Sequence, residues 1–273
     1  MSDAVVLTLR EPLDGPLDVS CVAPDRFAVL GEEEIARLPV WRGAVAARLG
    51  DFFAVAGGRA GRVRVEGASA HLDGLGADAA GGELLVDGDA GRRTAAGMTA
   101  GTVDVRGSVG DDAGVAMGGG TLRVSGRAGD RLGAASAGAS RGMTGGEIVI
   151  AGSAGSEAGA RARRGLVVVA GDAGARGARD MIAGTLVVLG RAGAGTGVGS
   201  KRGSVVAVGG VEVPVTYQYA CTYQPPHVRL MFTYLRRRYG LDVAARAAVG
   251  RYRRYCGDAG DPGKGEILEW VPE

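Results

Sequence analysis

The sequence is poor in the residues that most catalytic and metal centres use. It contains two histidines, His71 and His227, and three cysteines, none of which form a CxxC pair. This shortage argues against a thiolate zinc site, a disulfide framework and most histidine-based acid–base arrangements. We therefore expect no catalytic residue and no metal ligand on this chain, and thiols that are buried or idle.

Aromatic residues and long apolar runs are also scarce. Aromatics make up 5% of the chain, so Val, Leu, Ile and Ala must fill a narrow core. No run of 18 apolar residues occurs, and the N-terminus lacks the apolar segment of a signal peptide. The net charge of +2 is not the strongly basic balance of a nucleic-acid-binding protein. These features predict a compact, soluble, cytoplasmic protein.

Glycine, by contrast, accounts for 51 of the 273 residues and recurs with a period of 19. One step of 26 interrupts the period, because it contains an insertion at residues 134–140. The first column of glycines opens each apolar run and consists of Gly82, Gly101, Gly120, Gly146, Gly165, Gly184 and Gly203. The second column follows six positions later and consists of Gly88, Gly107, Gly126, Gly152, Gly171, Gly190 and Gly209.

Apolar residues stand two and four positions after each opening glycine, as in Leu122 and Val124. A period of two within five residues predicts a strand with one face toward a core. One short strand cannot bury its own face, so the units must stack and pair in parallel. The sequence therefore predicts an all-β chain in which residues 56–210 form a right-handed parallel β-helix of about seven to eight 19-residue coils. Its corners need close backbone approach or positive φ, and we expect positive φ at Gly171.

Two columns outside the core suggest what surrounds the rod. Eleven positions after the opening glycines the charge alternates in sign, which predicts a surface ladder of ion pairs. Its members are Arg93, Asp112, Arg131, Glu157 and Arg176. The outward strand positions are polar in early coils and apolar in later ones, and a strand that is apolar on both faces is covered on both. Either the C-terminal segment, which we favour, or another subunit covers the later positions Val149, Val168, Val187 and Val206.

The two ends of the chain differ from the repeat. Residues 1–55 are predicted to form an N-terminal α/β portion. Residues 211–273 are predicted to form a helical tail that packs on the rod or on a partner. Within the tail we expect a strand over 211–217, a helix over 227–239 that stops at Gly240, and a second helix over 243–255.

Four segments of the chain resemble a known family. They are GGGTLRVSGRAGDRLG (118–133), RGMTGGEIVIAGSAG (141–155), DMIAGTLVVLGRAGAGTGVGSKRGSVVA (180–207) and RRYCGDAGDPGKGEIL (253–268). The family is the C subunit of formylmethanofuran dehydrogenase and, more closely, its bacterial relative in the formyltransferase/hydrolase complex. The glycine repeat alone also resembles the C-terminal domain of glutamate synthase, so a spacer domain of that kind is an alternative. A free-standing β-helix enzyme that acts on polysaccharides would carry an acidic groove, and no consistent acidic column is present.

The resemblance implies a scaffold subunit in one-carbon metabolism. In such complexes a formyltransferase subunit moves the formyl group from tetrahydromethanopterin to a methanofuran-type cofactor. A metal-dependent, amidohydrolase-like subunit then releases formate. The resemblance thus implies a hetero-oligomer with these two partners, no cofactor bound by this chain, and the metal on another subunit.

One cluster of cations is the candidate binding site. Arg163 and Arg164 hold the same coil positions as Lys201 and Arg202, two coils away, or about 9.6 Å at the usual strand spacing. This spacing leaves room for a carboxylate-rich cofactor tail or for an acidic patch of a partner. The alternative is a solvated turn with scattered charge, which is the usual role of surface charges.

Overall fold

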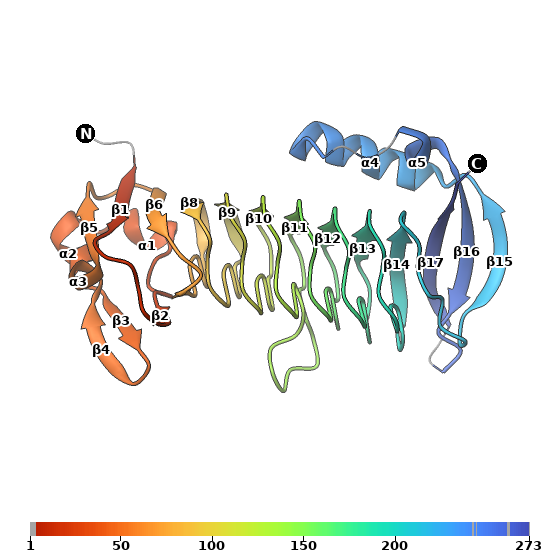
Figure 1. The fold of residues 1–273 in the computed structure, drawn as a ribbon, viewed down its shortest axis with the longest axis horizontal. Coiled ribbons are helices and arrows are strands. Elements are labelled where there is room, and N and C mark those ends of the chain that lie inside the picture. The colour runs from red at the N-terminus through yellow and green to blue at the C-terminus, as the bar shows by residue number, and fades with distance from the viewer. Residues whose placement is uncertain (1–3, 242, 244, 261–262, 273) are drawn as a thin grey trace.

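The computed structural model describes residues 4–241, 243, 245–260 and 263–272, and it has the shape of a long rod (Figure 1). Strands that pair in parallel form the middle of the rod, so the chain is mostly β, of the β-helix-like kind that the sequence predicts. These strands are β6 (Arg62–Ala68), β8 (Ala80–Gly88), β9 (Ala100–Val105), β10 (Thr121–Val124), β11 (Glu147–Ile150), β12 (Leu166–Val169), β13 (Thr185–Val188) and β14 (Arg202–Ala207).

The register of the strands follows the spacing of the apolar residues. Leu122 of β10 lies opposite Val103 of β9, 19 residues earlier in the chain. It also lies opposite Ile148 of β11, 26 residues later. The insertion at residues 134–140 therefore leaves the rod as a loop between β10 and β11 and does not shift the register of the sheet (Figure 1).

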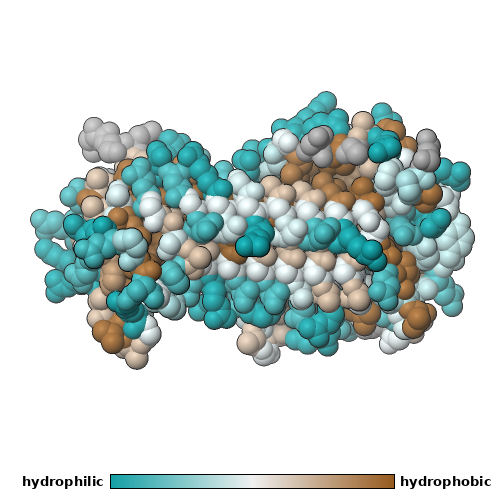
Figure 2. Space-filling view, viewed as in Figure 1, coloured by the Kyte–Doolittle hydropathy of each residue, from teal (hydrophilic) through white to brown (hydrophobic). Residues whose placement is uncertain are grey.

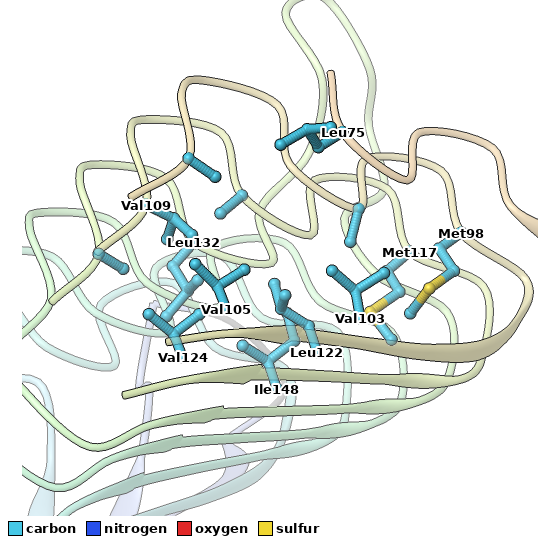
Figure 3. Close-up of a cluster of buried hydrophobic side chains, with 14 of the residues drawn as sticks. Leu75, Met98, Val103, Val105, Val109, Met117, Leu122, Val124, Leu132 and Ile148 are labelled. Atoms are coloured by element: carbon cyan, nitrogen blue, oxygen red, sulfur yellow. The ribbon is translucent and has the colours of Figure 1, made fainter. Parts of the chain in front are cut away.

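The inward positions of the strands fill the core with aliphatic side chains (Figure 3). Leu122, Val103 and Val105 are at most 1% exposed. Methionines close one side of the core, where Met98 and Met117 lie beside these strands. The Met117 methyl group is so close to the next coil that a Cβ on Gly146 would lie 2.7 Å from it. The side chains of the narrow core thus fill the space as far as the backbone at this corner of the coil.

A second wall faces the strands. Its small inward residues, from Ala90 and Val109 to Ala192 and Val211, form a continuous row of parallel bridges between coils. Side chains at the corners of this wall bind the next coil. The Asp89 carboxylate accepts the Ser108 N–H at 2.7 Å, and the Asp172 carboxylate accepts the Arg191 N–H, also at 2.7 Å. These bonds link successive coils at corners where regular strand pairing ends.

The glycine columns have two different causes. All seven opening glycines have positive φ, between 77° and 112°. In the second column only Gly88 does, so the expectation of positive φ at Gly171 is wrong. Close approach of the preceding coil explains that position, because a Cβ on Gly171 would lie 2.5 Å from Ser153 Oγ and 2.8 Å from the Gly152 carbonyl carbon.

The N-terminal portion closes one end of the rod (Figure 1). Its first strand pairs in parallel with β6, and Val5 and Leu7 extend the core beyond Val63 and Val65. A small sheet in the order β4-β3-β2-β7 lies beside it. The elements are β1 (Val5–Leu9), β2 (Leu17–Asp18), α1 (Pro24–Phe27), α2 (Glu32–Ala36), β3 (Pro39–Arg42), β4 (Val45–Arg48), α3 (Leu49–Phe52), β5 (Phe53–Ala56) and β7 (Leu72–Asp73).

The C-terminal tail contains more strand than the sequence predicts. Its elements are β15 (Gln218–Tyr223), α4 (Pro226–Tyr239), α5 (Ala245–Val249), β16 (Arg251–Gly257) and β17 (Lys264–Val271). The helix that ends at Gly240 is confirmed, and this glycine has φ of 66°. The strand expected over 211–217 is wrong, because the strand begins at Gln218. The second helix stops before Gly250, which packs against Trp270, and residues 251–257 form a strand.

The tail strands continue the sheet of the rod. β17 pairs in parallel with β14, and β16 and β15 follow in antiparallel order. The complete sheet has 13 strands in the order β15-β16-β17-β14-β13-β12-β11-β10-β9-β8-β6-β1-β5. The tail therefore closes the second end of the core, where Ile267 is fully buried.

Helix α4 covers the apolar outer face of the later strands, as favoured from the sequence. Val168 and Val187 are fully buried beneath it, and Phe232 and Leu235 of the helix belong to the same cluster. Figure 2 shows hydrophobic residues gathered between this helix and the rod, below the hydrophilic residues on top of the helix. The chain itself thus supplies the cover.

Candidate binding surfaces

The four predicted cations lie at one corner of the rod. Arg163 and Arg164 immediately precede β12, and Lys201 and Arg202 stand at the start of β14. All four residues are exposed. The backbone places the two pairs equivalently, because Arg163 and Lys201 each donate their N–H to a methionine carbonyl of the preceding coil at 2.8 Å. Ile182 and Ala183 hold the same positions in the coil between them.

The structure adds a fifth cation to this corner. Lys264 of β17 lies opposite Arg202 in the parallel register of β14 and β17. The sequence itself indicates that Lys264 belongs to this corner, because Lys264 precedes Gly265 just as Arg164 and Arg202 precede opening glycines. We name Arg163, Arg164, Lys201, Arg202 and Lys264 the corner cluster. Such a group of exposed cations suits a multivalent carboxylate, with an attraction that salt screens.

A second surface is a groove of about 820 Å³ between the inserted loop and the rod. The loop is tied down where Arg161 donates to the Ala139 carbonyl at 3.1 Å. Cations and carboxylates both line the groove and pair with one another, since Arg131 contacts Asp112 at 2.7 Å. The groove therefore has little uncompensated charge with which to attract an ion.

Four of the five residues of the predicted charge ladder line the groove: Arg93, Asp112, Arg131 and Glu157. Two steps of the ladder form ion pairs, Arg131 with Asp112 at 2.7 Å and Arg176 with Glu157 at 3.2 Å. All five ladder residues have positive φ, between 58° and 64°. The ladder thus lies at a tight turn of each coil. Each of its two ion pairs joins one coil to the next, and the pairs do not form a continuous chain along the rod.

Groups that could act as nucleophiles or metal ligands are dispersed. Both histidines are exposed, and burial raises the pKa of the Cys21 thiol to about 12, which keeps it protonated. All three cysteines are free. Within the described ranges no three His, Cys, Asp or Glu side chains come together as metal ligands would. No helix in the same ranges is long and apolar enough to cross a membrane.

One carboxylate at the C-terminal end of the rod has a structural role. Asp258 is 4% exposed and accepts the N–H groups of Gly199 at 2.9 Å and Gly260 at 2.8 Å. Burial acts to raise the pKa of this carboxyl, but these backbone N–H bonds outweigh it, so the pKa lies below its ordinary value. The charged form of Asp258 therefore stabilises the end of the rod.

We predict that Asp258→Asn destabilises the protein in a pH-dependent way. A lowered pKa in the folded state contributes stability that is complete above the ordinary pKa and is lost as the pH falls through the folded-state pKa. The difference in free energy of unfolding between wild type and variant should be largest near neutral pH and shrink below about pH 3.8. Denaturant titrations at pH 7, 5 and 3 measure it. A difference that stays constant over this range would contradict a role for the charge.

Comparison with known proteins supports the resemblance that the four sequence segments carry. No protein-family model matches the chain. The C subunit of the molybdenum-containing formylmethanofuran dehydrogenase 1 of Methanosarcina barkeri is 33% identical over 92 residues. That match spans 32% of this chain and 31% of the relative, less than a third of either protein.

A solved structure matches over the whole length. It is the crystal structure of the formyltransferase/hydrolase complex from Methylorubrum extorquens with methylofuran. One of its chains is 36% identical to this protein, with a TM-score of 0.89, over 98% of this chain and 100% of that one. Identity at this level across both full lengths shows common descent as well as a common fold. The chain therefore belongs to the family of formyltransferase/hydrolase complex subunits that are related to the C subunit of formylmethanofuran dehydrogenase.

Proposed function

We propose that the protein is the non-catalytic scaffold subunit of a formyltransferase/hydrolase complex. In this complex a formyltransferase subunit passes the formyl group of formyl-tetrahydromethanopterin to a methanofuran-type cofactor, and an amidohydrolase-like subunit releases formate. The observation that carries the proposal is the full-length match to one chain of such a complex. The rod is inferred to have seven to eight coils. We infer that it is right-handed, because parallel crossover connections are right-handed in about 98% of cases.

The distribution of chemical groups supports a scaffold role. Hydrolysis of a formamide near neutral pH needs an activated water and a proton donor for the amine, usually a metal ion with an acid or base. The titratable side chains described above serve the fold: Asp258 closes the end of the rod, and Asp112 and Glu157 join its coils. The chemistry is therefore assigned to the partner subunits.

Co-expression with the two partner subunits tests the proposal. The tagged full-length chain should copurify with both, and the complex should release formate from formyl-tetrahydromethanopterin. The chain alone, supplied with the formylated furan cofactor, should release none. Formate release by the isolated chain would overturn the scaffold role, and failure to bind either partner would overturn membership of the complex.

We further propose that the corner cluster binds an anion, either the carboxylate-rich tail of the furan cofactor or an acidic patch of a partner. The support is chemical: five exposed cations lie at equivalent corners of three coils. The coils of β14 and β17 are neighbours, and β13 separates the coil of β12 from that of β14. A carboxylate-rich tail fits this donor set, because ammonium and guanidinium groups provide several N–H donors for carboxylates.

Reversal of charge at this corner tests the site. Changing Arg163, Arg164, Lys201 and Arg202 to Glu should raise the KM for the furan cofactor or weaken assembly by about tenfold at low salt, and less at high salt. The matched control reverses four exposed arginines elsewhere: Arg48, Arg59, Arg127 and Arg191. Kinetics and gel filtration of the complex at two salt concentrations measure both effects. Equal behaviour of the two variants would remove the corner cluster from consideration.

A further inference from the structure

Helix α4 has a second face that the rod does not use. Val228, Phe232 and Leu235 point to the rod and are at most 2% exposed. On the opposite side of the helix, Leu230 is 70% exposed. Tyr234, one turn later, is 42% exposed, and only its hydroxyl reaches back to the rod. With Arg237, these residues follow the i, i+4, i+7 spacing of an anchor stripe that a partner groove receives.

The charge of α4 is all of one sign. The helix carries Arg229, Arg236, Arg237 and Arg238 and no Asp or Glu. In the part of the chain that the structure describes, none of these arginines lies within 4.0 Å of a carboxylate, whereas Arg131 and Arg176 of the rod do. The outer face of α4 is thus positively charged, and no described carboxylate compensates it.

Helix stability explains only part of this pattern. Cations in the last turn are favourable, because they oppose the negative end of the helix dipole, and Arg236 also donates to the Val243 carbonyl at 2.8 Å. Arg229 lies near the start of the helix, where the dipole disfavours a cation and the first turn holds no acid. A leucine beside it that is mostly solvated, Leu230, contributes little to the folded chain. The exposed positions of Arg229 and Leu230 are therefore better explained by contact with a partner than by the stability of the helix.

The helix is held firmly in place. Tyr234 donates to the Glu147 carboxylate at 2.9 Å, and the Tyr239 hydroxyl donates to the same carboxylate. The Arg123 guanidinium lies 5.7 Å from the centre of the Tyr239 ring. A surface fixed in this way loses little conformational entropy when a partner binds.

We propose that the outer face of α4 docks into a groove on a partner subunit of the same complex, a groove with an apolar centre and an acidic rim. Leu230 is the central anchor, and Arg229 and Arg237 face the acidic rim. A protein partner fits better than a nucleic acid, because the apolar and mostly exposed Leu230 stands at the centre of this face. The inference rests on the proposed function, which supplies the partner.

The test measures binding of the full-length chain to the purified formyltransferase and amidohydrolase-like subunits at 50 and 500 mM NaCl. Arg229→Glu with Arg237→Glu should raise the Kd at least about tenfold at 50 mM NaCl and flatten its salt dependence. Leu230→Ser should raise the Kd about tenfold at both salt concentrations. Arg229→Gln with Arg237→Gln should have a smaller effect than charge reversal.

Matched controls separate docking from general effects. Arg127→Glu with Arg191→Glu makes the same charge change at exposed rod arginines, and Val29→Ser removes an apolar side chain that is 73% exposed. Both should leave the Kd within twofold of wild type, and thermal unfolding of every variant should match wild type.

The outcomes distinguish this inference from the proposed function. If the wild-type chain binds the subunits and the α4 variants bind equally well, docking through α4 is wrong and the scaffold role stands. If the wild-type chain binds neither subunit, the proposed function fails and the docking surface fails with it. Loss of self-association in the α4 variants, with partner binding intact, would identify a second copy as the occupant and overturn the proposal.

Discussion

A chain that ends after Val211 is expected to aggregate or to lose its partners. Truncation removes α4 and so exposes a continuous apolar surface over β11–β14. This surface consists of Val149, Val168, Val187 and Val206, which are at most 4% exposed in the complete chain. Contiguous apolar patches of this kind drive association of soluble proteins. Truncation also removes β17, which leaves the backbone of β14 as an open sheet edge.

Gel filtration and light scattering of the truncated chain measure the effect, and a second variant separates the two causes. Replacing the four outer valines with threonine in the truncated chain should restore much of the solubility if the apolar face dominates. If the open edge of β14 dominates, this variant should aggregate as strongly as the simple truncation. A truncated chain that stays monomeric and assembles with its partners would show that the tail is dispensable.

The rod could be predicted from the sequence because each unit repeats the same physical constraint. Residues two and four positions after an opening glycine are forced inward, so Leu122 and Val124 indicate a strand without knowledge of their neighbours. Helix α4 was equally predictable, since its apolar residues follow the helical period and Gly240 ends it.

The tail was harder to predict because it breaks the repeat and then resumes it. Burial alternates only over the first three residues of 251–257, and the spacing of Tyr252 and Tyr255 also fits a helix. Pairing with β17 decides in favour of a strand. β17 itself continues the repeat, because Gly265 and Ile267 stand as an opening glycine and its inward residue do. Gly265 follows Gly203 by 62 positions, and this separation hides the relation.

Of the candidate binding surfaces, too, one part could be predicted from the repeat and another part depends on the three-dimensional fold. Equivalent coil positions of Arg164 and Arg202 follow from the period alone, and the register of β14 with β17 adds Lys264 beside Arg202. The unbalanced charge on α4 could not be inferred from the sequence, because it depends on which carboxylates the fold brings near. Only the three-dimensional arrangement shows that Glu147 binds tyrosines of this helix and none of its arginines.

Substitution of Gly171 is expected to destabilise the rod strongly. A Cβ at this position would lie 2.5 Å from Ser153 Oγ and 2.8 Å from the Gly152 carbonyl carbon, both in the preceding coil. The backbone atom cannot move aside without breaking the bond that Gly171 N–H donates to the Gly152 carbonyl at 2.9 Å. Overpacking of this kind typically costs about 1–3 kcal/mol, so Gly171→Ala should be destabilised by that amount. Gly171→Val should be destabilised further, because its branched side chain adds contacts with the same coil.

The control is Gly81→Ala, at a rod glycine where an added Cβ would meet no other atom within 4 Å and where φ is not positive. Denaturant unfolding should place Gly81→Ala near wild type and both Gly171 variants well below it. Adding Ser153→Ala to Gly171→Ala should recover only part of the loss, because it removes the contact with Oγ and leaves the contact with the Gly152 carbonyl carbon. Equal unfolding midpoints for Gly171→Ala and Gly81→Ala would mean that the coils have room to separate at this corner, and close backbone approach would no longer explain the second glycine column.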